Sequence, residues 1–157
     1  MTTAIAQFMR ELEGVWEAHR AALARGDLAA ALATMTAEPS VTHIPALTGG
    51  SGRAGVEDFY AGQFLPHRPA DLAPSRISRT VDRWRLVEET TVSFTHDREL
   101  PWLLPGVEPT FRRAEVLAIA VVGFHRTKIQ SVRVLWDYAT LLAQLSITVP
   151  VASAPVR

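Results

Sequence analysis

An α+β fold in a single domain is what the sequence predicts, and three observations predict it. The chain has 157 residues, which is the size of one domain. Its first part carries apolar residues every three or four positions, as in helices with one buried face, and its second part carries them at every other position, as in half-buried strands. We therefore expect residues 1–148 to form helices packed on an antiparallel meander, followed by a flexible tail at 149–157.

Three helices are expected before the long strands. Thr3–Arg25 spaces its apolar residues for one face of a helix, and Gly26 is suited to end that helix. Asp27 can cap a second, short helix at Leu28–Met35, because its side chain can accept a hydrogen bond from a free N–H group of the first turn. A third helix is expected at Ala54–Phe64, after a glycine-rich loop.

Five strands and a closing helix account for the rest of the domain. Ser40–Ile44 is a short strand candidate that ends at Pro45. Four longer strands, rich in Val, Ile, Thr and aromatic residues, are expected at Arg76–Trp84, Leu86–His96, Arg112–Phe124 and Ile129–Trp136. His125–Lys128 is short enough for a hairpin turn, and Tyr138–Leu145 is expected to add a final helical turn or two.

Composition excludes several classes of function. The chain has no cysteine, which removes disulfides, thiolate metal sites and cysteine nucleophiles. Sixteen basic residues balance sixteen acidic ones, whereas nucleic-acid binders show a basic excess. Lys128 is the only lysine, in a polar turn unsuited to Schiff-base chemistry. With no signal peptide and no apolar run long enough to span a membrane, we expect a cytoplasmic protein without nucleic-acid or membrane partners.

A glycine-rich segment formally matches a dinucleotide-binding loop. Gly50–Gly55 has the spacing G-x-G-x-x-G, and Asp71 follows about twenty residues later. A Rossmann site, however, needs a crossover between parallel strands, with the acidic residue at the end of the second strand. Asp71 lies in a proline-rich segment and the following strands are expected to be antiparallel. The segment is therefore interpreted as a flexible loop that leads into a helix.

Two of the five histidines are candidates for proton transfer. His43 and His96 each stand at the end of a predicted strand among apolar neighbours. Imidazole can gain or lose a proton near neutral pH, so this placement suits acid–base chemistry. A hydrogen-bonded histidine at the edge of the core is the alternative for each. His19 is expected on a helix surface, and because no histidine has the spacing of a metal-binding motif, no metal site is expected.

The last predicted strand is followed directly by Asp137, beside Trp136. Burial next to tryptophan would raise the pKa of this carboxyl group and make it a usable acid or base. Two alternatives remain open. Asp137 can cap the helix that begins near Tyr138, or it can pair with Arg133, which shares its strand face.

Four groups of segments, taken in order, carry a resemblance to a known family. They are Arg25-Gly-Asp27, the loop Thr48–Arg53 with Phe59-Tyr60, the stretch Phe94–Asp97 with Trp102–Gly106 and Pro109-Thr110, and the ending Val134–Asp137 with Leu141–Leu145. Together they resemble the nuclear transport factor 2-like superfamily, and within it the SnoaL-like polyketide cyclases. The third group also looks like a bacterial subgroup labelled carboxymethylenebutenolidase-related.

The resemblance implies a cone in which three N-terminal helices and a strongly curved antiparallel sheet enclose an apolar pocket. It implies that Asp137 is the acid/base, that His96 points into or beside the pocket and that His43 lies where the first strand meets it. A homodimer packed through the outer face of the sheet is also implied. The expected contacts to substrate, as walls, lid and a positive charge, are Trp16, Tyr60, Phe64, Trp102 and Arg133.

The leading hypothesis is a cofactor-independent acid/base enzyme that acts on a small apolar or cyclic molecule, as a SnoaL-like cyclase or isomerase does. A first alternative is an epoxide or lactone hydrolase, in which Arg133 and Asp137 would help to activate water. A second alternative is a non-catalytic module that binds small molecules or proteins. Fold alone does not separate these functions, because one fold hosts many chemistries.

Overall fold

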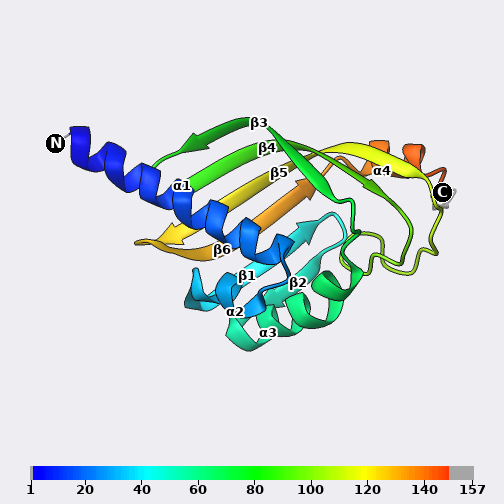
Figure 1. Ribbon diagram of the computed structural model, residues 1–157, viewed down its shortest axis with the longest axis horizontal. Coiled ribbons are helices and arrows are strands. Elements are labelled where there is room, and N and C mark those ends of the chain that lie inside the picture. Colours follow the sequence, from blue (N-terminus) through cyan, green and yellow to red (C-terminus); the bar gives the residue numbers. More distant parts are fainter. Residues whose placement is uncertain (1, 149–157) are drawn as a thin grey trace, which may run out of the picture.

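The computed structural model describes residues 2–148, so the tail expected at 149–157 lies outside the described residues. Six strands form one curved sheet, and the N-terminal helices lie against it (Figure 1). The α+β fold class predicted from the two periodicities is confirmed. The helices are α1 (Thr2–Ala24), α2 (Leu28–Ala33), α3 (Gly52–Phe59) and α4 (Tyr138–Gln144). The strands are β1 (Met35–Ile44), β2 (Thr48–Ser51), β3 (Ala73–Val81), β4 (Arg85–Thr95), β5 (Arg113–His125) and β6 (Lys128–Trp136).

Strand order in the sheet is β2-β1-β6-β5-β4-β3. The long strands β3 to β6 form the expected antiparallel meander, but β1 pairs with β6 in parallel, so the sheet is mixed. Only a hairpin connection imposes the antiparallel direction on two strands. β1 and β6 are joined instead through the whole intervening chain, and no local signal fixed their relative direction.

The glycine-rich segment forms a strand where a flexible loop was expected. Thr48–Ser51 is β2, which pairs with β1 at the edge of the sheet. A Cβ on Gly49 would lie 1.8 Å from the carbonyl oxygen of Val41, and a Cβ on Gly50 would lie 2.1 Å from that of Gly55. These glycines therefore allow close backbone packing between β1, β2 and α3, which explains a motif that resembles a nucleotide-binding loop only in spacing.

Local signals place the ends of the first two helices. Gly26 adopts φ +75° directly after α1, and the amide of Asp27 donates to the carbonyl of Ala22. The Asp27 side chain then accepts a hydrogen bond from Ala30 N at the start of α2, as expected of an N-cap. The third helix is less regular than predicted, because α3 continues as a π-helical turn at Tyr60–Phe64 and a short 3-10 turn at Leu65–His67.

Candidate functional site

A cavity of about 440 Å³ lies between α1 and the inner face of the sheet. Its more exposed lining residues are Glu17, Ala21 and Ala24 on α1 and Pro74 on β3, so the cavity opens between this helix and the edge strand. The deeper lining residues, from the sheet, the turns that follow α3 and the loop after β4, are His43, Phe64, Glu88, Thr90, Val92, Trp102, Ala118, Ala120, Val134 and Trp136.

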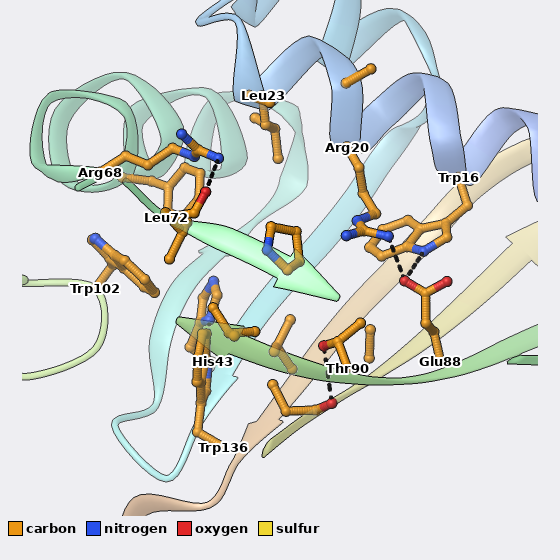
Figure 2. A pocket seen from close by; sticks show the side chains of 18 of the residues that line it. Trp16, Arg20, Leu23, His43, Arg68, Leu72, Glu88, Thr90, Trp102 and Trp136 are labelled. Carbon is orange, nitrogen blue, oxygen red and sulfur yellow. Dashed lines mark hydrogen bonds and ion pairs between the residues drawn. The ribbon is translucent and has the colours of Figure 1, made fainter. Parts of the chain in front are cut away.

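Strand register sets the floor of the cavity. Glu88, Ala120, Val134 and His43 stand opposite one another across β4, β5, β6 and β1. The alanine in this row fills little space, which helps to leave room under α1. Glu88 and His43 are three strand spacings apart, or about 14 Å along the sheet. The two side chains therefore reach opposite ends of a bound molecule rather than the same atom (Figure 2).

His43 marks the aromatic end of the cavity. Its ring lies 5.4 Å from that of Trp102 and 6.2 Å from those of Phe64 and Trp136, measured between centroids. The indole N–H of Trp136 donates a hydrogen bond to His43 Nδ1 at 3.1 Å. The other ring nitrogen, Nε2, has no hydrogen-bond partner within residues 2–148 and is not sealed from the cavity that His43 lines.

Burial keeps the imidazole of His43 neutral. It lowers the pKa of His43 to about 4, because the charged form would lose its hydration without gaining an anion. A neutral imidazole carries one proton, and the hydrogen bond accepted by Nδ1 places that proton on Nε2. His43 therefore presents a single N–H donor to the cavity at neutral pH, suited to the carbonyl oxygen of a ligand.

Glu88 marks the charged end of the cavity, and its side chain is 1% exposed. Its Oε1 accepts hydrogen bonds from Arg20 Nη1 at 2.6 Å and Trp16 Nε1 at 3.3 Å. Its Oε2 accepts a hydrogen bond from Arg79 Nε at 2.7 Å and forms an ion pair with Arg79 Nη2 at 2.5 Å. A carboxylate has about four acceptor positions, so these four contacts leave Glu88 little capacity to take a proton from a ligand.

Arg79 extends this ion-pair network to the surface. Its side chain, 8% exposed, also pairs with Glu17 and lies 3.6 Å from Glu13, both on α1. The Arg79 interaction holds the pKa of Glu17 below its usual range. The network thus joins α1 to strands β3 and β4, and both carboxylates that line the cavity take part in its ion pairs.

The structure does not place Asp137 in the cavity. Asp137 is exposed, and its side chain accepts a hydrogen bond from Thr140 N as the N-cap of α4. Alternation along β6 explains this result, since Val134 and Trp136 face the cavity and the residues between and after them face outward. Of the interpretations left open by the sequence, the geometry matches the cap, and no ion pair joins Asp137 to Arg133 in the described part of the chain.

His96 directly follows β4 and is fully buried, but it does not line the cavity. Its Nδ1 accepts a hydrogen bond from Thr110 N at 3.2 Å and lies 3.0 Å from the Thr110 hydroxyl. Its Nε2 has no partner in the part of the chain that the structure describes. Phe94 and His96 lie farther along the strand than the cavity-lining Val92, so His96 matches the alternative of a hydrogen-bonded histidine at the edge of the core.

The expected wall residues divide into two groups. Trp16, Phe64 and Trp102 line the cavity. Tyr60 does not, because its hydroxyl is buried against His19 Nε2 at 2.9 Å, and Arg133 is exposed on the outer face of the sheet. His19 is 1% exposed, which corrects the expectation of a surface position. It falls on the apolar stripe of α1 with Leu12 and Trp16, a helical spacing that could have located it.

Several polar residues that line the cavity were not predicted from the sequence, namely Arg20, Arg68, Glu88 and Trp136. Glu88 carried a usable signal, because it is a charged residue on the otherwise apolar face of β4. Arg20 and Arg68 carried none, since nothing local distinguishes them from solvated arginines. Among residues 2–148, no group of three or more side chains is arranged to hold a metal ion, and no helix is long and apolar enough to cross a membrane.

Known structures share this fold. A protein of Jannaschia sp. CCS1 described as a SnoaL-like polyketide cyclase matches with a TM-score of 0.75 and 14% identity, over 90% of this chain and 96% of that one. AclR of Streptomyces galilaeus, described as a hydroxylase, matches with a TM-score of 0.67 and 21% identity, over 92% and 91%. A nuclear transport factor 2-like protein of Burkholderia pseudomallei K96243, of unknown function, matches with a TM-score of 0.65 and 16% identity, over 87% and 98%.

The chain therefore has the nuclear transport factor 2-like fold, as the resemblance implied. No protein-family model matches the sequence, and no curated protein does. The carboxymethylenebutenolidase-related subgroup stays a prediction.

Proposed function

We propose that the protein is a cofactor-independent enzyme that binds a small cyclic ketone-like molecule and promotes its cyclisation or isomerisation by hydrogen bonding to a carbonyl oxygen. One observation carries the proposal, namely the neutral imidazole of His43 at the aromatic end of an otherwise largely apolar cavity. Ring closure and isomerisation of such molecules pass through enol-like states in which negative charge develops on oxygen. A fixed N–H donor among apolar rings stabilises that charge.

The proposal changes the residue roles expected from the resemblance. His43 keeps a role in the chemistry, as a hydrogen-bond donor to the substrate. Asp137 stabilises α4 as its N-cap, and His96 stabilises the edge of the core. Both carboxylates that line the cavity are engaged in ion pairs. With both carboxylates engaged, a water molecule in the open cavity takes the C–H proton and returns it to the new carbon position. This favours substrates whose C–H bond is already acidified by two neighbouring carbonyls, because water is a weak base. It disfavours epoxide hydrolysis, which needs a free carboxylate to activate water.

A ligand carrier is the second candidate, and the same ion pairs favour it. A cavity that offers hydrogen-bond donors but no free base can hold a ligand without changing it. Dimerisation through the outer face of the sheet and a cytoplasmic location remain predictions under both candidates.

Exchange of carbon-bound protons with deuterium separates the two candidates. Aromatic 1,3-diketones of one, two and three rings, each with protons between the two carbonyls, would be incubated with the protein in D2O and followed by NMR. Binding would be followed by quenching of tryptophan fluorescence, since Trp16, Trp102 and Trp136 line the cavity. We expect the wild-type protein to bind at least one ketone and accelerate its exchange, and His43→Phe to lose the acceleration while binding weakens less than about tenfold.

The control is His125→Phe, at an exposed position at the end of β5, which should behave as the wild type. Binding without any accelerated exchange would favour the carrier. Acceleration that survives in His43→Phe would remove His43 from the chemistry.

A further inference from the structure

Arg68 lines the cavity on the segment between α3 and β3, and its side chain is half-buried. Two hydrogen bonds to the backbone fix this segment. The indole N–H of Trp102 donates to the carbonyl of His67 at 3.2 Å, and Arg98 Nη1 donates to the carbonyl of Arg68 at 3.2 Å. The backbone at Arg68 is therefore fixed by these hydrogen bonds, next to Trp102 at the aromatic end of the cavity.

The charge of Arg68 is not balanced by the protein. Arg20, the other arginine of the lining, pairs with Glu88, whereas no carboxylate lies within ion-pair distance of Arg68 among residues 2–148. Its one side-chain hydrogen bond in that range is a long contact, from Nη2 to the carbonyl of Leu72 at 3.5 Å (Figure 2). Partial burial lowers the pKa of the guanidinium, yet arginine stays charged at neutral pH.

A half-buried cation without an anion is costly for a protein to maintain, and a ligand that supplies the anion removes that cost. Guanidinium groups match planar carboxylates through two parallel N–H donors. In Figure 2, Arg68 lies on the same side of the view as Trp102 and His43 and away from the Glu88 network. A molecule whose rings pack against the aromatic end could therefore direct a carboxylate toward Arg68.

We propose that Arg68 is an anion-recognition residue and that the substrates are cyclic carboxylic acids, with an apolar ring system packed toward His43 and a carboxylate paired with Arg68. This inference rests on the proposed function, since it needs small cyclic molecules to occupy the cavity. It adds the class of substrate, because a neutral polycycle would leave Arg68 without a partner.

Matched pairs of ligands test this inference. The probes are benzoate, 2-naphthoate and 9-anthracenecarboxylate, each paired with its neutral amide of nearly equal shape, and affinity would be measured by tryptophan fluorescence at neutral pH and low salt. We expect the wild-type protein to bind at least one acid about tenfold more tightly than its amide. Arg68→Gln should reduce this ratio to about one, and Arg68→Lys should keep part of it, because charge remains while the planar pair of donors is lost.

Arg133→Gln is the matched control, since Arg133 is exposed on the outer face of the sheet, and it should keep the full wild-type ratio. Thermal unfolding of each variant would confirm that it is folded. Equal affinity for acid and amide in the wild-type protein, or an undiminished preference in Arg68→Gln, would overturn the inference while leaving the cavity as a ligand site. Failure of every acid and every amide to bind the wild type would overturn the proposed function and this inference together.

Discussion

The two ends of the cavity solve the problem of a buried polar group in opposite ways. At the aromatic end, His43 stands among rings and stays neutral, with burial lowering its pKa to about 4. At the charged end, the Glu88 carboxylate accepts hydrogen bonds from Trp16, Arg20 and Arg79 and forms ion pairs with both arginines. His43 at one end has lost its charge, and Glu88 at the other end has gained partners.

This difference distinguishes a buried polar group that a ligand can bind from one that only stabilises the fold. The Nε2 donor of His43 has no partner among the described residues, so a ligand can use it. The oxygens of Glu88 are already used, so this carboxylate serves to fasten α1 to β3 and β4. A buried titratable residue in a cavity is thus a functional candidate only when the surrounding protein leaves one of its atoms free. The following predictions test each side of this comparison, in order of decreasing effect.

Glu88→Gln is expected to have the largest effect. The substitution keeps the shape of the side chain but removes the negative charge that pairs with Arg20 and Arg79. The side chain of Arg79 is 8% exposed. Breaking a buried ion pair from one side costs about 3–5 kcal/mol, so the free energy of unfolding in urea should fall by about that amount. Glu89→Gln, at the next and more exposed position, should change it by less than about 0.5 kcal/mol. A small change in the free energy of unfolding of Glu88→Gln would mean that the ion-pair network does not stabilise the packing of α1 on β3 and β4.

Lowering the pH is expected to reduce the stability of the folded protein through His43, at the aromatic end of the cavity. The folded protein holds His43 neutral down to about pH 4, whereas the unfolded chain protonates it near pH 6.5. The unfolded state therefore binds more protons between these values, and the stability that His43 contributes above pH 6.5 is lost as the pH falls toward 4. Between pH 7 and pH 5, the wild type should lose about 2 kcal/mol more than His43→Gln does.

His125→Gln provides the control for this measurement. His125 is exposed at the end of β5, so its replacement should leave the pH dependence of the wild-type protein unchanged. If His43→Gln loses as much stability on acidification as the wild type, then His43 is not held neutral by burial and the proposed donor has the wrong protonation state.

Asp137 is expected to show the smallest effect, because it lies outside both ends. Asp137→Ala removes the N-cap of α4 and should cost about 1 kcal/mol in unfolding free energy, whereas Asp137→Asn should cost much less, since asparagine also caps. Neither variant should change the affinity for ketones or their deuterium exchange. Loss of the accelerated exchange in a stable Asp137→Asn protein would restore the acid/base role that the family resemblance implies for this residue.

Local features of the chain were predictable because their causes are local. Gly26 and Asp27 mark the boundary between two helices through the backbone freedom of one residue and the side-chain acceptor of the next, and the structure matches both. Alternation along the later strands likewise located β3 to β6 to within a few residues. Asp137 shows the limit of such signals, because its capping role was visible as one alternative but its distance from the cavity was not.

Non-local features escaped prediction for an equally physical reason. The parallel pairing of β1 with β6 sets His43 opposite Val134, and no residue near His43 encodes that register. Arg79 reaches Glu17 and Glu88 only because α1 lies across the sheet, so a mutual arrangement of three elements decides which charges are neutralised. The same holds for Arg68, whose lack of an anionic partner is a property of its whole surroundings.

The sequence by itself determined the fold class, most element boundaries and the exclusion of cysteine chemistry, because periodicity, caps and composition act over a few residues. Only the tertiary structure decided which polar groups face the cavity, which of them already have partners and which remain free. Those properties depend on contacts between residues far apart in the chain, such as the hydrogen bond from Trp136 to His43 and the ion pair between Arg20 and Glu88.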